Sequence, residues 1–150
     1  MAADIKSISD AIVSRLATQV PALNEQTVAT FTGSEADLAE QGRNLPFVGL
    51  CLSSVGYRHL NAEESLARED ISFSLKVVVE DFRGQGYSLE TGYGLLDDLR
   101  DCLLGARLGI DGLAPLELGS INLDSAAEKQ GLAVFSTSVS TWQLRQKPGS

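Results

Sequence analysis

The feature that most constrains the fold is a stretch of strict alternation in the middle of the chain. From residue 71 to residue 80, every second side chain is large and apolar, and the residues between are mostly polar. Side chains of a β-strand point alternately to its two faces, so this period of two predicts a half-buried strand. The apolar series is Ile71, Phe73, Leu75, Val77 and Val79, and the intervening residues are Ser72, Ser74, Lys76, Val78 and Glu80.

Two helices are expected around this strand. Apolar residues at helical spacing predict the first helix over residues 5–20, ended by Pro21. Ser7 and Asp10 have the spacing of a capping box, and Asp4 is an alternative start. Gly105 stands where a glycine would end the second helix. The predicted buried face of that helix is Leu89, Tyr93, Leu96, Leu99 and Leu103, with Leu95 and Cys102 beside it and Asp97, Asp98, Arg100 and Asp101 exposed.

Further strands are expected at 27–32, 47–57, 116–123 and 132–144, the last two joined as a hairpin through 124–131. Residues 34–43 suit a short exposed helix or a loop, and residues 58–69 suit a long solvated loop. In the strand at 47–57, the predicted faces are Val48, Leu50 and Leu52 on one side and Phe47, Cys51, Val55 and Tyr57 on the other.

The order of these elements predicts the fold class. Strands outnumber helices, and most connections suit hairpins, so an α+β fold is expected. We expect a mostly antiparallel or mixed sheet of about five strands, with the two main helices packed on one face. The length suits a single domain that spans residues 1–150.

The balance of charge restricts the possible partners. The chain has 12 Lys and Arg against 20 Asp and Glu, a net charge of −8, so it lacks the basic footprint of a nucleic-acid binder. Five basic and ten acidic residues fall between positions 58 and 101. No apolar run approaches the ~20 residues of a membrane span, and the first residues do not resemble a secretory signal.

The cysteines point to a reducing compartment. Cys51 and Cys102 are isolated in apolar surroundings and are expected to be buried, reduced core residues, although a disulfide between them stays open. Folding in the cytoplasm follows from this interpretation.

The chain offers little for catalysis. His59 is its only histidine, which leaves no set of zinc ligands and favours a solvated loop residue. Gly84 and Gly86 lie between a strand and a helix, but Leu89 stands where a dinucleotide-binding motif needs its third glycine. Adjacent acids at 63–64, 69–70, 80–81 and 97–98 are expected on solvated faces. The sequence therefore predicts no enzyme and no catalytic, cofactor-binding or metal-binding residues.

Two glycines in the second helix have two interpretations. Either the helix begins after Gly92, or Gly92 and Gly94 permit a close approach to the sheet or to a neighbouring subunit.

Several segments resemble a known family. Residues 86–112 read GYSLETGYGLLDDLRDCLLGARLGIDG, and they are followed by Pro-Leu-Glu-Leu at 115–118 and by a Ser/Thr-rich segment ending Thr-Trp-Gln-Leu at 141–144. The first helix contributes Asp-Ala-Ile-Val-Ser-Arg-Leu at 10–16. This pattern resembles the tail terminator protein family of Mu-like contractile-tailed phages.

The resemblance implies a structural protein of the virion, in the tail or neck, assembled in the host cytoplasm. Its subunits would form a hexameric ring that caps the tail tube and sheath, stops tail polymerisation and offers a docking surface for head–tail joining. The implied partners are further copies of this chain, the tail tube protein, the sheath protein and a neck or connector protein, with no membrane. DNA would pass through the lumen without specific binding, and the acidic bias would keep it from adhering.

Two other functions stay open at this point. One is a neck or head–tail adaptor or a minor tail protein of the same kind of phage. The other is a small-molecule-binding domain that uses the loop between Arg58 and Arg68 or the turn at Gly84–Gly86, with a pocket lined by Arg58 or Arg83.

Overall fold

The computed structural model describes residues 2–30, 46–61, 65–80, 87–124 and 132–146. The expectations for residues 34–43, for the turn at Gly84–Gly86, for Arg83 and for residues 125–131 lie outside these ranges. The elements, in chain order, are α1 (Ile5–Gln19), β1 (Val28–Thr30), β2 (Phe47–His59), β3 (Leu66–Glu80), α3 (Tyr87–Leu103), β4 (Glu117–Leu118), β5 (Asn122–Asp124) and β6 (Leu132–Gln146).

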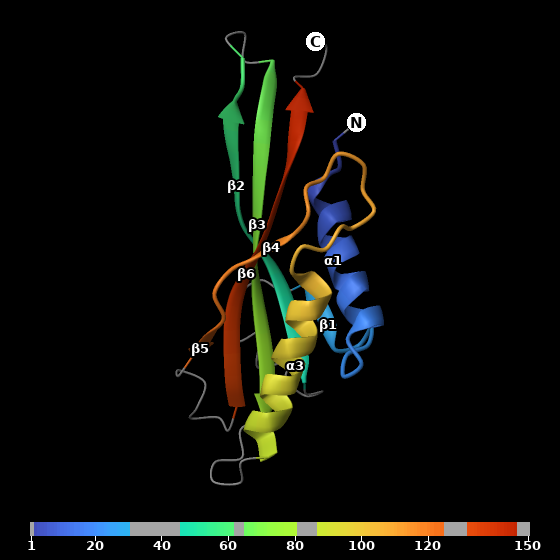
Figure 1. Cartoon of the computed structure of the whole chain (residues 1–150), viewed down its shortest axis with the longest axis vertical. Helices are drawn as coiled ribbons and strands as arrows, with labels where there is room; N and C mark the ends of the chain where they lie inside the picture. Colours follow the sequence, from blue (N-terminus) through green and yellow to red (C-terminus); the bar gives the residue numbers. More distant parts are fainter. Residues whose placement is uncertain (1, 31–45, 62–64, 81–86, 125–131, 147–150) are drawn as a thin grey trace.

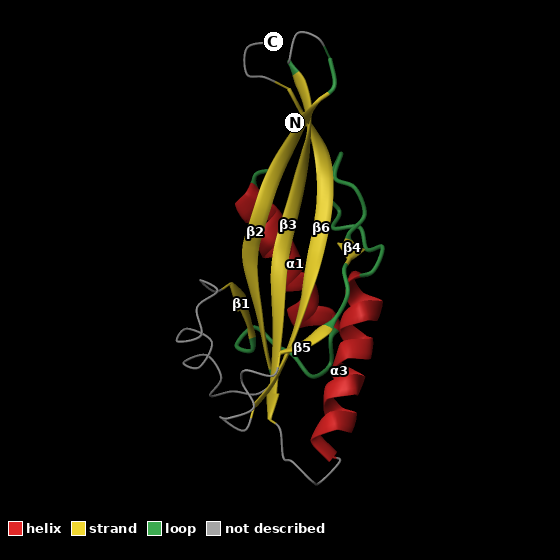
Figure 2. Ribbon diagram, turned by 90° about the vertical axis from the view of Figure 1, so that its left-hand side faces the viewer, coloured by secondary structure: helices red, strands yellow, loops and turns green. Residues whose placement is uncertain are grey.

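The strands form one mixed, mostly antiparallel sheet in the order β1-β2-β3-β6-β4, with β5 also paired to β6. Only the β1–β2 pair is parallel among the described strands. Figure 1 shows α1 and α3 on the same side of this sheet, and Figure 2 looks onto the opposite face, with α1 behind the strands. The predicted α+β class and the placement of both helices on one face are confirmed.

The strand that alternates most strictly lies at the centre of the sheet. Its apolar series from Ile71 to Val79 is buried and packs with α1, α3 and β6 in the main core. A smaller cluster lies on the other face of the sheet and contains Phe47, Val78 and Val134. The strand expected at 116–123 is instead two short ones, β4 and β5, which both pair with the long β6 as the predicted hairpin requires.

The first helix is capped by Asp4. Its Oδ1 accepts a hydrogen bond from the backbone N–H of Ser7 at 2.7 Å, so Ser7 is the partner of the cap and not the cap itself. This hydrogen bonding lowers the pKa of Asp4. The helix ends at Gln19, two residues before Pro21, and buries Ile8, Ile12 and Leu16.

The second helix excludes the first interpretation of its glycines, which was that the helix begins after Gly92. It begins at Tyr87, so Gly92 and Gly94 lie inside it. A Cβ added at Gly94 would have no neighbour within 4 Å, which means that Gly94 makes no close approach to this chain's own sheet. Tyr93, expected on the buried face, is exposed. Gly105 has a φ of +69°, as expected of a glycine that follows a helix.

The main correction concerns residues 58–69, which are not a long loop. Strand β2 continues to His59 and β3 begins at Leu66, so most of the segment belongs to an antiparallel pair. A bulge at Ser53, between the pairs Leu52–Phe73 and Ser54–Ser72, shifts the register by one residue. Because a shift of one residue exchanges the two faces of a strand, Val55 and Tyr57 lie on the helix side and not on the side predicted for them.

Candidate functional site

The end of the sheet where β2 finishes is built differently from the rest. Strands β2, β3 and β6 continue past α1 at this end, as Figure 1 shows at its top. Here β3 pairs on both sides, with β2 and with β6. Within the described residues, the outer side of β2 pairs with another strand only over residues 48–50. The outer side of β6 pairs with β5 and β4 over residues 134–136 and 139–140, and its last backbone hydrogen bond in the described chain is the one that the carbonyl of Trp142 accepts from the N–H of Ala114. We call this section, residues 52–59, 66–71 and 141–146, the sheet tip.

A buried polar cluster anchors the chain's start to the sheet tip. The Glu69 side chain lies on the helix face and the residue is only 2% exposed. It accepts a hydrogen bond from Nε2 of Gln143 at 2.8 Å, and the same Nε2 donates to the carbonyl of Ala3 at 2.8 Å. The backbone N–H of Ala3 donates in turn to Oε1 of Gln143 at 3.0 Å. These contacts fix the segment before α1 against β6.

Two neighbours complete the cluster. Arg145 Nε lies 3.1 Å from Oε2 of Glu69 and forms an ion pair with it, outside hydrogen-bond geometry. The Glu69 carboxylate also raises the pKa of Tyr57, first by hydrogen bonding to its phenol. The guanidinium and the phenol both reach solvent, so the cluster connects the buried carboxylate to the surface of the tip.

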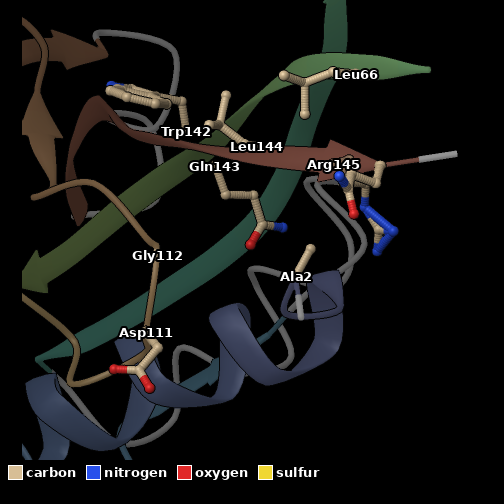
Figure 3. Close-up of a pocket in the computed structure, with 9 residues that line it drawn as sticks. Ala2, Leu66, Asp111, Gly112, Trp142, Gln143, Leu144 and Arg145 are labelled. Carbon is tan, nitrogen blue, oxygen red and sulfur yellow. The ribbon is translucent and has the colours of Figure 1, made fainter. Parts of the chain in front are cut away.

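A hollow of about 700 Å³ lies along the outer side of β6 in the sheet tip. It is lined by residues 142–146, by Ala2 and Leu66, and by Asp111 and Gly112 from the segment after α3. In Figure 3, Gln143 points toward Ala2 while Trp142 and Leu144 project from the other side of the strand. The hollow therefore follows the edge of a strand and is not a closed cavity between elements.

The face of the tip opposite the helices carries a second, smaller hollow of about 270 Å³. Arg68 lies at its wall, with its guanidinium 4.3 Å from the centre of the Trp142 ring. Nε of Arg68 also donates to Oδ1 of Asp70 at 2.9 Å. Stacking and pairing already engage Arg68, the one cation among the described residues that line this hollow, so it is not free to bind an anionic ligand.

The structure places Arg58 and Arg68, the two ends of the loop in the alternative small-molecule site, on strands. Arg58 of β2 lies directly opposite Arg68 of β3, and both side chains face away from the helices. No loop holds this pair as a binding site. His59 is an exposed residue at the end of β2, and the described residues contain no group of three or more His, Cys, Asp or Glu side chains that could hold a metal ion.

Some of the acids and cysteines lie where the sequence predicted them, and others do not. The exposed acids of α3, Asp97 and Asp101, pair with Arg100 as solvated residues do. Glu69, expected on a solvated face, is buried instead. Cys102 is buried and free, and burial raises the pKa of its thiol, whereas Cys51 is free but only half-buried. Neither described helix has the length and the apolar run that a membrane crossing needs.

The buried cluster was missed although the sequence contains a signal for it. The alternation of β3, continued backward from Ile71, places Glu69 on the core face, and the same parity in β6 joins Val139 to Gln143. Interpreting residues 58–69 as a loop broke that continuity. Two polar residues at core positions of neighbouring strands predict a paired hydrogen bond, because each would otherwise be buried without a partner.

Comparison with known proteins supports the fold. No protein-family model matches the chain, and no curated protein sequence matches it. Among solved structures, a chain from the virion of a native gene transfer agent particle aligns with a TM-score of 0.68 and 14% identity, over 96% of this chain and 100% of that one. A second solved chain aligns over 98% of this chain and 99% of its own length at 16% identity, but its TM-score of 0.44 is too low to indicate a common fold. The chain therefore has the fold of one component of that virion particle.

Proposed function

We propose that this protein is a structural component of a phage or phage-like virion, and specifically a ring-forming tail terminator. The observation that carries the proposal is the alignment with a chain of the gene transfer agent virion, which extends over the whole of that chain. The resemblance of residues 86–112 to the tail terminator family supports the finer assignment. In this role the protein binds the last ring of the tail tube, stops polymerisation of tube and sheath, and presents its other side to the neck.

The surface of the chain suits assembly better than turnover of a metabolite. Large apolar side chains are exposed on both outer strands of the sheet tip, where they would remain in water in an isolated subunit. They include Leu52 and Tyr57 on β2 and Leu144 on β6. The proposal includes a ring of six copies. It also includes the partners of that ring, which are the tube protein, the sheath protein and a neck or connector protein.

Charge contributes the second part of the proposal. With a net charge of −8 per subunit, a closed ring surrounds the DNA path with like charge and lets DNA pass without adhering. On α3, Asp98 is an exposed acid outside the ion pairs that Arg100 forms with its neighbours. If such acids face the lumen, Asp98→Lys slows DNA passage without unfolding the subunit, and unchanged DNA ejection after each such reversal contradicts the electrostatic part.

The experiment is to mix gold-labelled protein with purified tail tubes and with purified portal–connector complexes, and to locate the label by negative-stain electron microscopy. A terminator labels one end of each tube. Label on the portal–connector complex alone would instead identify a neck adaptor, and label along the tube or on neither would reject the tail role. A subunit with the Leu16→Ala core substitution, heat-unfolded before mixing, controls for nonspecific adhesion.

A further inference from the structure

The two outer strands of the sheet tip expose backbone groups that can extend the sheet. In β6, the carbonyl of Trp142 accepts a hydrogen bond from Ala114 on the side away from β3. Backbone groups of successive residues alternate between the two sides of a strand, so Leu144 and Gln146 direct their N–H and C=O groups to that same outer side. Within the described residues, nothing pairs with the outer side of β6 beyond Trp142.

The outer side of β2 is open over a longer stretch. Val48 donates to the carbonyl of Thr27 on the side away from β3. The extra residue of the bulge at Ser53 shifts the alternation by one position after that point. The described chain leaves β2 without an outer partner from residue 51 onward. Before the bulge, Leu52 points its backbone groups outward as Val48 does, and after it Val55, Tyr57 and His59 do.

Open edges of this length are a template for adding another strand, and isolated proteins usually block them. Here the side chains beside them favour burial: Leu52 on β2 and Leu144 on β6 are 44% and 49% exposed. The charges are complementary as well. Residues 51–59 contain Arg58 and His59 but no acid, whereas the hollow along β6 contains the exposed Asp111, and the Arg145 beside it is already paired with Glu69.

We propose that the open edge of β2 in one subunit pairs with the open edge of β6 in a second copy of this chain, so that the sheet continues from subunit to subunit. This proposal deepens the ring-forming role given above by naming its interface. The two edges lie on opposite sides of the same tip, as Figure 2 shows, so the contact is head-to-tail. Such contacts close into rings when the rotation between neighbours permits it.

The first test compares self-association of the full-length chain and three variants by sedimentation velocity. Leu52→Lys and Leu144→Lys place an edge-blocking charge on β2 and on β6 respectively. Each is expected to weaken association by about tenfold or more. Leu104→Lys is the matched control, because Leu104 is 59% exposed but lies just after α3 and belongs to neither edge strand, and it should associate like the unsubstituted chain. Circular dichroism verifies that each variant is folded.

The second test determines the orientation of the contact by disulfide cross-linking. Arg58 and Leu144 each lie opposite Arg68, on the face away from the helices, and so stand at one level of the tip. Equal amounts of Arg58→Cys and Leu144→Cys subunits are mixed under mild oxidation, with Gly56→Cys in place of Arg58→Cys as a scan of the register. A heterodimer between a β2 variant and the β6 variant is expected, and the unsubstituted chain should give no cross-link.

Three results would overturn the interface. They are no self-association at the highest soluble concentration, association that both lysine variants retain, and cross-linked homodimers in place of heterodimers. The proposed tail role has a separate outcome. Subunits that associate through these edges but bind no tube end refute the tail role and leave the interface, whereas lysine variants that still form complete rings on tube ends refute the interface and leave the tail role.

Discussion

Replacing Glu69 with alanine perturbs the sheet tip at its most buried polar point. The substitution leaves one N–H of Gln143 without its acceptor and removes the counter-charge of Arg145. A hydrogen bond to a charged group contributes about 1.5–3 kcal/mol. The Arg145 side chain is 41% exposed and can turn to water, so loss of the ion pair adds little. We therefore expect the free energy of unfolding to fall by about 2 kcal/mol, with a Tm lower by roughly 4–8 °C.

The assay is urea unfolding monitored by circular dichroism and by fluorescence of the single tryptophan, Trp142. Asp70→Ala is the matched control, because Asp70 is the next residue, faces the other side of the sheet and forms a half-exposed pair with Arg68. Such a pair contributes about 0–1 kcal/mol. Glu69→Gln keeps an acceptor for Gln143 and should have an intermediate effect. If Glu69→Ala costs no more stability than Asp70→Ala, the cluster does not anchor the tip as described.

Three further predictions concern the helices. Asp4→Ala removes the cap hydrogen bond to Ser7 and should lower the Tm. Because folding lowers the pKa of Asp4, its stabilising contribution is present above about pH 3.9, the ordinary pKa of Asp, and is lost as the pH falls through the lower pKa of the folded state. A Tm difference that persists at pH 2 would contradict this explanation. Gly105→Ala should destabilise the protein by about 1 kcal/mol in thermal unfolding, because Gly105 has a positive φ. Gly94→Ala should stabilise it by up to ~1 kcal/mol, because Gly94 lies inside α3 and an added Cβ meets no neighbour. Effects of equal sign would refute this reasoning. Burial raises the pKa of the Cys102 thiol, so near neutral pH this thiol should be alkylated far more slowly in the native protein than in the unfolded protein. Equal alkylation rates, measured by mass spectrometry, would contradict that burial.

Local patterns were sufficient for most of the fold. The alternation at 71–79 predicted the central strand, and the helical spacing of Ile8, Ile12 and Leu16 predicted the buried face of α1, because one side of each element must be apolar to cover the other. The order of the elements also predicted that the two main helices pack on one face of the sheet. The sequence could not show that β1 pairs in parallel with β2, since that pairing depends on where the chain returns and not on local residues.

The sheet tip was the part that local patterns could not predict. Charged residues such as Arg58 and Arg68 are typical of loops, yet here they lie opposite each other on neighbouring strands. Arg68 is held there by stacking on Trp142 and by its ion pair with Asp70. A bulge adds one residue without changing composition, so the faces of β2 could not be assigned beyond Leu52. The candidate interface depends on both features, because the bulge determines which backbone groups point outward.

The most direct test of the central claim is the length of tail tubes assembled from tube protein in the presence of this chain. A protein that binds the growing end and closes it should stop elongation, so adding it at one ring per tube early in assembly should shorten the mean tube length seen by electron microscopy, and adding it later should leave longer tubes capped. Tubes that grow to the same lengths with and without the protein would contradict the account.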